Sequence, residues 1–144
     1  MQPSRWISAI WIVVAIGIAP QLNAQSVFTA AATIKQRNQI AEAMRISDDA
    51  KTAVIEYFVQ NEKYPPDNAA SGLPAPKEIH NRYATSLEVK HGLIEITLGG
   101  EAVDALQGKH IMLRPAPLDA SGLRLNWSCV SPDIPRIDRP LECQ

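Results

Sequence analysis

The chain has 144 residues, of which 20% are charged and 46% apolar, and its formal net charge is −1. This length suits one domain with one modest core. The near-neutral balance gives no sign of a strongly basic surface for nucleic acid or of an acidic tract for a cationic partner.

An apolar run of 14 residues, Trp6 to Ala19, follows Arg5 and precedes a small residue, Ala24. This order is typical of a secretory signal, so we expect export and cleavage after Ala24. As a helix the run would be about 21 Å long, shorter than the roughly 30 Å hydrocarbon core of a bilayer. The alternative is an uncleaved anchor, with residues 6–19 as the only membrane contact. We expect residues 25–144 to form the globular domain.

A long helix is predicted next, because no proline or glycine occurs between Ala30 and Asn61 and apolar residues recur mostly three and four apart. Its span is about residues 30–61, and its apolar stripe should be covered by a sheet. The helix should stop at Tyr64-Pro65-Pro66, because Pro65 restricts the residue before it and Pro66 lacks an amide donor. The predicted stripe consists of Ile34, Ile40, Met44, Ala50, Ala53, Val54, Tyr57 and Phe58.

Residues 62–86 are rich in proline, glycine and small side chains, which predicts a surface loop with at most a short helical turn. Two short runs then alternate apolar and polar residues, Leu87–Val89 and Ile94–Leu98. Lys90-His91-Gly92 between them predicts a hairpin, because glycine tolerates positive φ. His91 is therefore expected in a turn and not as a ligand.

Two further strands are predicted, one at Ile111 and Leu113 and one from Leu123 to Cys129, joined around residues 119–122. Every second residue of the last strand is apolar or cysteine, so one face should be buried. The predicted fold is α+β, with one long N-terminal helix packed on a four-stranded antiparallel sheet that spans residues 87–129.

Both cysteines, Cys129 and Cys143, lie among the last 16 residues. In an exported chain an even number favours one disulfide, and the alternative is two free buried thiols. The disulfide would close a loop of about 15 residues and stabilise the fold by roughly 3 kcal/mol. The loop is proline-rich and charged, so it is either a rigid recognition surface or only a cap on the sheet. The candidate recognition residues are Pro132, Pro135, Arg136, Asp138 and Arg139.

No catalytic, cofactor or metal motif is visible. His80, His91 and His110 are spread over different predicted elements, without a second ligand at metal-binding spacing. The adjacent pair Asp48-Asp49 would diverge by about 100° on a helix, so these carboxylates cannot act together. We therefore expect a protein that is not an enzyme and has no cofactor.

Residues 41–89 resemble the second half of the long helix and the following αβ-loop of type IVa pilins. Trp127-Ser128-Cys129 and the segment to Cys143 are similar to that family's disulfide-bounded D-region. The resemblance implies a pilin-like roll with an αβ-loop at residues 62–86 and a D-region at residues 129–143. The remaining matching pieces are Glu42-Ala43-Met44, Ala50-Lys51-Thr52-Ala53-Val54, Glu56-Tyr57, Tyr64-Pro65 and Asn68-Ala69-Ala70-Ser71-Gly72-Leu73-Pro74.

The N-terminus differs from the family pattern. Members begin their mature chain with phenylalanine after a glycine, followed by Thr-Leu-Ile-Glu, whereas residues 4–10 read SRWISAI, without the glycine or the glutamate. The prepilin peptidase motif is therefore missing.

The resemblance implies a structural or adhesive subunit of a bacterial surface pilus, whose partners are other pilins or assembly proteins and a surface receptor or ligand. The alternative is a periplasmic binding or regulatory module that does not polymerise.

Overall fold

The computed structural model describes residues 24–117 and 125–144. Two helices, α1 (Ala24–Met44) and α2 (Ser47–Asn61), precede four strands, β1 (Ala84–Lys90), β2 (Leu93–Leu98), β3 (His110–Pro117) and β4 (Leu125–Val130). The strands form one antiparallel sheet in the order β1-β2-β3-β4. The predicted α+β fold is therefore confirmed. Most of the predicted signal segment, Leu123 and the connection at residues 119–122 lie outside the described residues.

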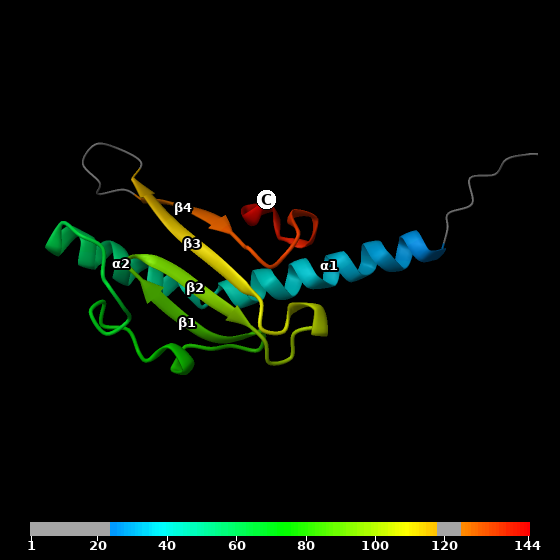
Figure 1. The fold of residues 1–144 in the computed structure, drawn as a ribbon, viewed down its shortest axis with the longest axis horizontal. Coiled ribbons are helices and arrows are strands. Elements are labelled where there is room, and N and C mark those ends of the chain that lie inside the picture. Colours follow the sequence, from blue (N-terminus) through cyan, green and yellow to red (C-terminus); the bar gives the residue numbers. More distant parts are fainter. Residues whose placement is uncertain (1–23, 118–124) are drawn as a thin grey trace, which may run out of the picture.

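The core lies between the helices and one face of the sheet. Helical residues Ile40 and Val54 and strand residues such as Leu87 and Ile96 are fully buried. In the strands burial alternates along the chain, as expected for a sheet with one covered face. Figure 1 shows α1 and α2 following one another along the sheet, with the first turns of α1 extending past the strands.

The predicted single helix over residues 30–61 is wrong in two respects: helix begins already at Ala24, and it is interrupted at Arg45–Ile46. At the interruption the amides of Arg45 and Ile46 bond to carbonyls three residues back, at Glu42 and Ala43. The buried Ser47 hydroxyl donates to the Met44 carbonyl (2.7 Å). These bonds replace the usual α-helical hydrogen bonds, in which each amide donates to the carbonyl four residues back, and so they end α1.

Asn81, near the C-terminal end of the αβ-loop, binds main-chain groups at the interruption. Asn81 Nδ2 donates to the Glu42 carbonyl (2.8 Å), while Asn81 Oδ1 accepts from the amides of Tyr83 and Ala84. Asn81 therefore joins the end of α1 to the start of the sheet. The helix ends before Tyr64-Pro65-Pro66, as predicted, with Glu62 in the left-handed conformation (φ 54°) as its cap.

The loop and the hairpin follow the prediction closely. The αβ-loop contains one short 3₁₀ turn, Pro76–Glu78, and β1 begins at Ala84, three residues before the predicted strand. His91 (φ 50°) and Gly92 (φ 82°) form the two-residue turn between β1 and β2. His91 is thus a turn residue, as predicted. The amides of this turn donate to the carbonyls of Pro65 and Pro66, which holds the loop against the hairpin.

Candidate interaction surface

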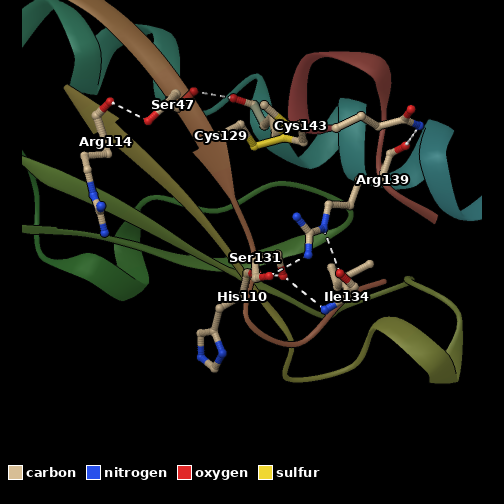
Figure 2. Close-up of a disulfide and its surroundings, with 11 residues drawn as sticks. Ser47, His110, Arg114, Cys129, Ser131, Ile134, Arg139 and Cys143 are labelled. Carbon is tan, nitrogen blue, oxygen red and sulfur yellow. Dashed lines mark hydrogen bonds between the residues drawn. A yellow bond between two sulfur atoms is a disulfide. The ribbon is translucent and has the colours of Figure 1, made fainter. Parts of the chain in front are cut away.

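The Cys129–Cys143 disulfide closes the C-terminal segment onto the sheet. Cys129 lies near the end of β4, and Cys143 lies in the last 3₁₀ turn, Leu141–Cys143; their Cα atoms are 4.6 Å apart. Cys143 is 1% exposed. Figure 2 shows the bond between β4 and this turn. The predicted disulfide is therefore present, and residues 129–143 form a closed loop, here called the D-region.

Polar side chains hold the D-region together mainly through main-chain carbonyls. Arg139 donates from Nε to the Ile134 carbonyl and from Nη2 to the Ser131 carbonyl, both at 2.7 Å. Figure 2 shows this guanidinium turned inward, toward Ser131 and Ile134. Ser131 Oγ donates to the His110 carbonyl (2.6 Å), which ties the loop to β3. These bonds fix the path of a segment that has little regular structure.

A second tie to β3 is the pair His110 and Asp133, which the sequence did not predict. Asp133 Oδ2 lies 2.7 Å from His110 Nδ1 and accepts from the His110 amide at 3.0 Å. The hydrogen bond from the His110 ring, together with that from its amide, lowers the pKa of the Asp133 carboxyl below its ordinary value. The two residues are 23 positions apart, and no sequence motif links them.

Ser131, His110 and Asp133 lie together, yet their bonds do not form a catalytic relay. The Ser131 hydroxyl donates to the main-chain carbonyl of His110 and not to its ring. Its oxygen also accepts from the Ile134 amide (3.2 Å). A nucleophilic serine needs its hydroxyl hydrogen-bonded to a base, which this geometry does not provide. Within the part of the chain that the structure describes, no three His, Cys, Asp or Glu side chains gather closely enough to hold a metal ion.

Helix α1 supports the D-region from the side. The guanidinium of Arg37 donates from Nε to the Ile137 carbonyl at 2.9 Å, and its Nη2 donates to the same oxygen. Thr33 Oγ1 donates to Asp138 Oδ1 at 3.1 Å. The D-region is thus fixed to three elements: α1, β3 and β4.

The five candidate recognition residues divide into two groups. Pro132, Pro135 and Arg136 are exposed, whereas Asp138 and Arg139 are half-buried and bonded within the fold. Two exposed apolar residues between and beyond them, Ile137 (69% exposed) and Leu141 (80%), were missed by the sequence analysis. The sequence did not indicate that these two side chains are exposed, because their exposure depends on two tight turns. The turns are the 3₁₀ segments Arg136–Asp138 and Leu141–Cys143, which point the side chains outward.

The first half of α1 carries a second apolar surface. Val27, Phe28 and Ile34 are 57%, 74% and 57% exposed. The prediction that Ile34 belongs to the stripe covered by the sheet is wrong. Ile34 is six residues before the buried Ile40, and six residues turn a helix by about 600°, which places the two side chains about 120° apart.

A protein-family comparison identifies the fold. The family model described as "Pilin (bacterial filament)" matches residues 36–144. The chain belongs to the pilin family. The match includes part of α1, the αβ-loop, the sheet and the D-region, in agreement with the resemblance seen in the sequence.

Individual relatives give the same result. The pilin is 30% identical over 97 residues to a fimbrial protein of Neisseria meningitidis serogroup A / serotype 4A (67% of this chain, 55% of that protein). It is 29% identical over 97 residues to the type IV major pilin protein PilE of Neisseria gonorrhoeae (67% and 56%). It is 32% identical over 100 residues to the fimbrial protein EcpC of Eikenella corrodens (66% and 62%). The matched region thus spans little more than half the length of these relatives.

Among residues 24–117 and 125–144, no helix is both long and apolar enough to cross a bilayer.

Proposed function

We propose that this pilin is a structural subunit of a type IV pilus, exported and displayed on the bacterial surface. The observation that carries the proposal is the uncovered first half of α1 on a pilin head. Val27 and Phe28 belong to the first turns of α1, which extend past the strands (Figure 1), and Ile34 lies on another side of the helix than the buried Ile40. Exposed apolar surface of this kind favours burial against another molecule, and in a filament protein other subunits would supply the cover. The partners are accordingly other pilins.

The D-region and the αβ-loop would then form the outer surface of the subunit. Pro132, Pro135 and Arg136 are the exposed candidates for contact with a receptor or ligand. A loop fixed by a disulfide and internal hydrogen bonds loses little conformational entropy on binding. In this proposal the head assembles with other subunits and contacts a receptor or ligand, and it catalyses no reaction. In this proposal residues 1–24 serve export or hydrophobic anchoring, and residues 25–144 form the head.

Immunogold labelling of cells that express the chain tests this function. Antibodies against the D-region should label appendages along their length, and sheared appendages should contain the chain. A strain that lacks the gene is the control for antibody specificity. Recovery of the chain only from the periplasm, with unlabelled appendages, would instead support the non-polymerising module.

A further inference from the structure

A cavity of about 290 Å³ lies beside the break between α1 and α2, where the αβ-loop passes the helices. Ile46 at the break and Ala50 near the start of α2 line its helix side. Leu73 and Ile79 line its loop side. Ala50 is buried and the other three are half-buried, so the cavity has apolar walls and is open to solvent.

The charged side chains of this cavity are all acidic. Asp49 and Glu78 contribute carboxylates and His80 contributes an imidazole, while no lysine or arginine is among the described residues that line it. Apolar walls with a few polar groups are the usual composition of a small-molecule site. The volume is at the lower end of the roughly 300–1,000 Å³ typical of such sites, so the cavity suits a small ligand.

Both carboxylates have unused capacity to accept hydrogen bonds. Asp49 has no hydrogen bond or ion pair within residues 24–117 and 125–144, although the adjacent Asp48 pairs with Lys51 at 3.3 Å. Glu78 accepts from the Ala75 amide through Oε2 (3.1 Å), which leaves its Oε1 for another donor. Hydrogen bonds from a cationic donor to a carboxylate are stronger than those between neutral groups, so this arrangement favours a cation.

A neighbouring cavity provides a comparison within the same loop. It has a volume of about 310 Å³, shares Leu73 with the first cavity, and is lined by two other carboxylates, Asp67 and Glu88. These carboxylates are already engaged. Asp67 Oδ1 accepts from the Ala70 amide at 2.8 Å, and Glu88 Oε2 lies 2.9 Å from Lys90 Nζ. A cation in that cavity would compete with Lys90, whereas in the first cavity it would compete with no lysine or arginine.

We propose that the cavity beside the helix break binds a small organic cation, an ammonium or guanidinium group on a short apolar body. The cationic group is held by Asp49 and Glu78, and the apolar body lies against Leu73 and Ile79. A neutral or anionic molecule of the same shape lacks the attraction to the two carboxylates. The inference goes beyond the pilus function and does not depend on it, because it assigns the head a small-molecule site that includes no residue of the D-region.

An NMR titration of the ¹⁵N-labelled full chain, kept in solution with a non-ionic detergent, tests the site. The three probes share a benzyl group: benzylamine is a cation at neutral pH, benzyl alcohol is neutral and phenylacetate is an anion. Benzylamine should shift the amide signals of residues 46–50 and 77–80 in a saturable manner. Benzyl alcohol should bind at least about tenfold more weakly, and phenylacetate should give no saturable shift.

Variants of single carboxylates test which residues hold the cation. Asp49→Asn and Glu78→Gln should each weaken benzylamine binding at least about threefold, because each removes one charge and keeps the size of the side chain. Asp67→Asn is the matched control, since it makes the same change in net charge at the neighbouring cavity and should leave the benzylamine affinity unchanged.

Several results would overturn the proposal. They are the absence of a saturable shift with benzylamine, equal binding of benzylamine and benzyl alcohol, and shifts confined to residues 67–70 and 88–90 around the neighbouring cavity. An equal loss of affinity in Asp67→Asn and Asp49→Asn would also overturn it, because it would show attraction by the charge of the whole chain. A charge-dependent benzylamine site in a chain that labels no appendage would support this inference while the pilus function fails.

Discussion

Single side chains that bind main-chain groups hold this pilin together at places where regular structure ends. Asn68 is 5% exposed, and its amide takes the place of a neighbouring strand at the outer edge of β1. Its Oδ1 accepts from the Val89 amide (2.6 Å), and its Nδ2 donates to the carbonyls of Leu87 (3.0 Å) and Pro74 (2.9 Å). One residue thus attaches the αβ-loop to the sheet and closes an open edge.

We predict that Asn68→Ala lowers the free energy of unfolding by about 2 to 3 kcal/mol, because main-chain groups that Asn68 satisfied lose their partner. Asn61→Ala is a suitable control, since Asn61 makes one exposed bond to the Tyr57 carbonyl and its loss should cost under about 0.5 kcal/mol. Urea unfolding of the two variants measures both values. Equal destabilisation would show that the edge contact of Asn68 is not important.

Asp133 predicts an acid-dependent loss of stability. Its pKa is lowered in the folded chain, chiefly by the hydrogen bond from the His110 side chain, so the folded state binds a proton less readily than the unfolded state. The contribution is complete above the unfolded carboxyl pKa of about 3.9 and is lost as pH falls through the lower folded value. The stability difference between the unmodified chain and Asp133→Asn should therefore be larger at pH 6 than at pH 2.5. The same unfolding series with Asp104→Asn, an exposed carboxylate in another loop, controls for the change in net charge.

The interrupted helix shows what a local sequence pattern can and cannot predict. The strands were predicted because alternation along a strand reports directly on its buried face, and the disulfide because two cysteines offered one intramolecular pairing. The interruption at Arg45–Ile46 was not predictable, because it depends on Asn81, 39 residues after Glu42. The pair His110 and Asp133 likewise depends on folding that brings β3 and the D-region together. Local sequence carries neither contact.

The hairpin between β1 and β2 requires glycine at position 92 for two reasons. Gly92 has φ 82°, and a Cβ there would lie 2.7 Å from Tyr64 Cγ. Gly72 has a similar φ of 72°, but a Cβ there would meet nothing within 4 Å. We expect Gly72→Ala to cost about 1 kcal/mol from backbone strain alone and Gly92→Ala at least about 1 kcal/mol more. Thermal or urea unfolding compares them, and equal costs would mean that Tyr64 moves aside freely.

The Cys129–Cys143 disulfide should also contribute measurably to the stability of the fold. Cys143→Ser should lower the free energy of unfolding by about 3 kcal/mol, because the unfolded chain regains the freedom of a 15-residue loop. The double variant Cys129→Ser and Cys143→Ser should match it, which excludes an effect of the remaining thiol. Two titratable thiols in the native protein would contradict the bond.

Helix α1 is one helix with two environments. Its C-terminal half is buried through Ile40 and Ala43, and Gln39 Oε1 accepts from the Val103 amide at 3.0 Å. Its N-terminal half carries exposed Val27 and Phe28. The head therefore supports the helix from one end only.

Amide hydrogen exchange should show this difference. In the unassembled chain, amides of residues 25–32 should exchange much faster than those of residues 36–44, because few buried contacts oppose local opening there. Mass spectrometry of peptides from both segments measures the ratio. Equal protection in the unassembled chain would mean that the first turns have a cover within the same molecule.

The manner in which the D-region is held has a consequence for sequence change. Arg37, Arg139 and Ser131 bind the carbonyls of Ile137, Ile134, Ser131 and His110, and a carbonyl is present whatever the side chain. The side chains displayed at positions 132, 135, 136 and 137 can therefore be exchanged without removing these anchors. The exposed residues of this surface can therefore change during evolution while the loop keeps its conformation. New residues grafted at these positions by design would likewise be displayed on a loop whose conformation is already fixed.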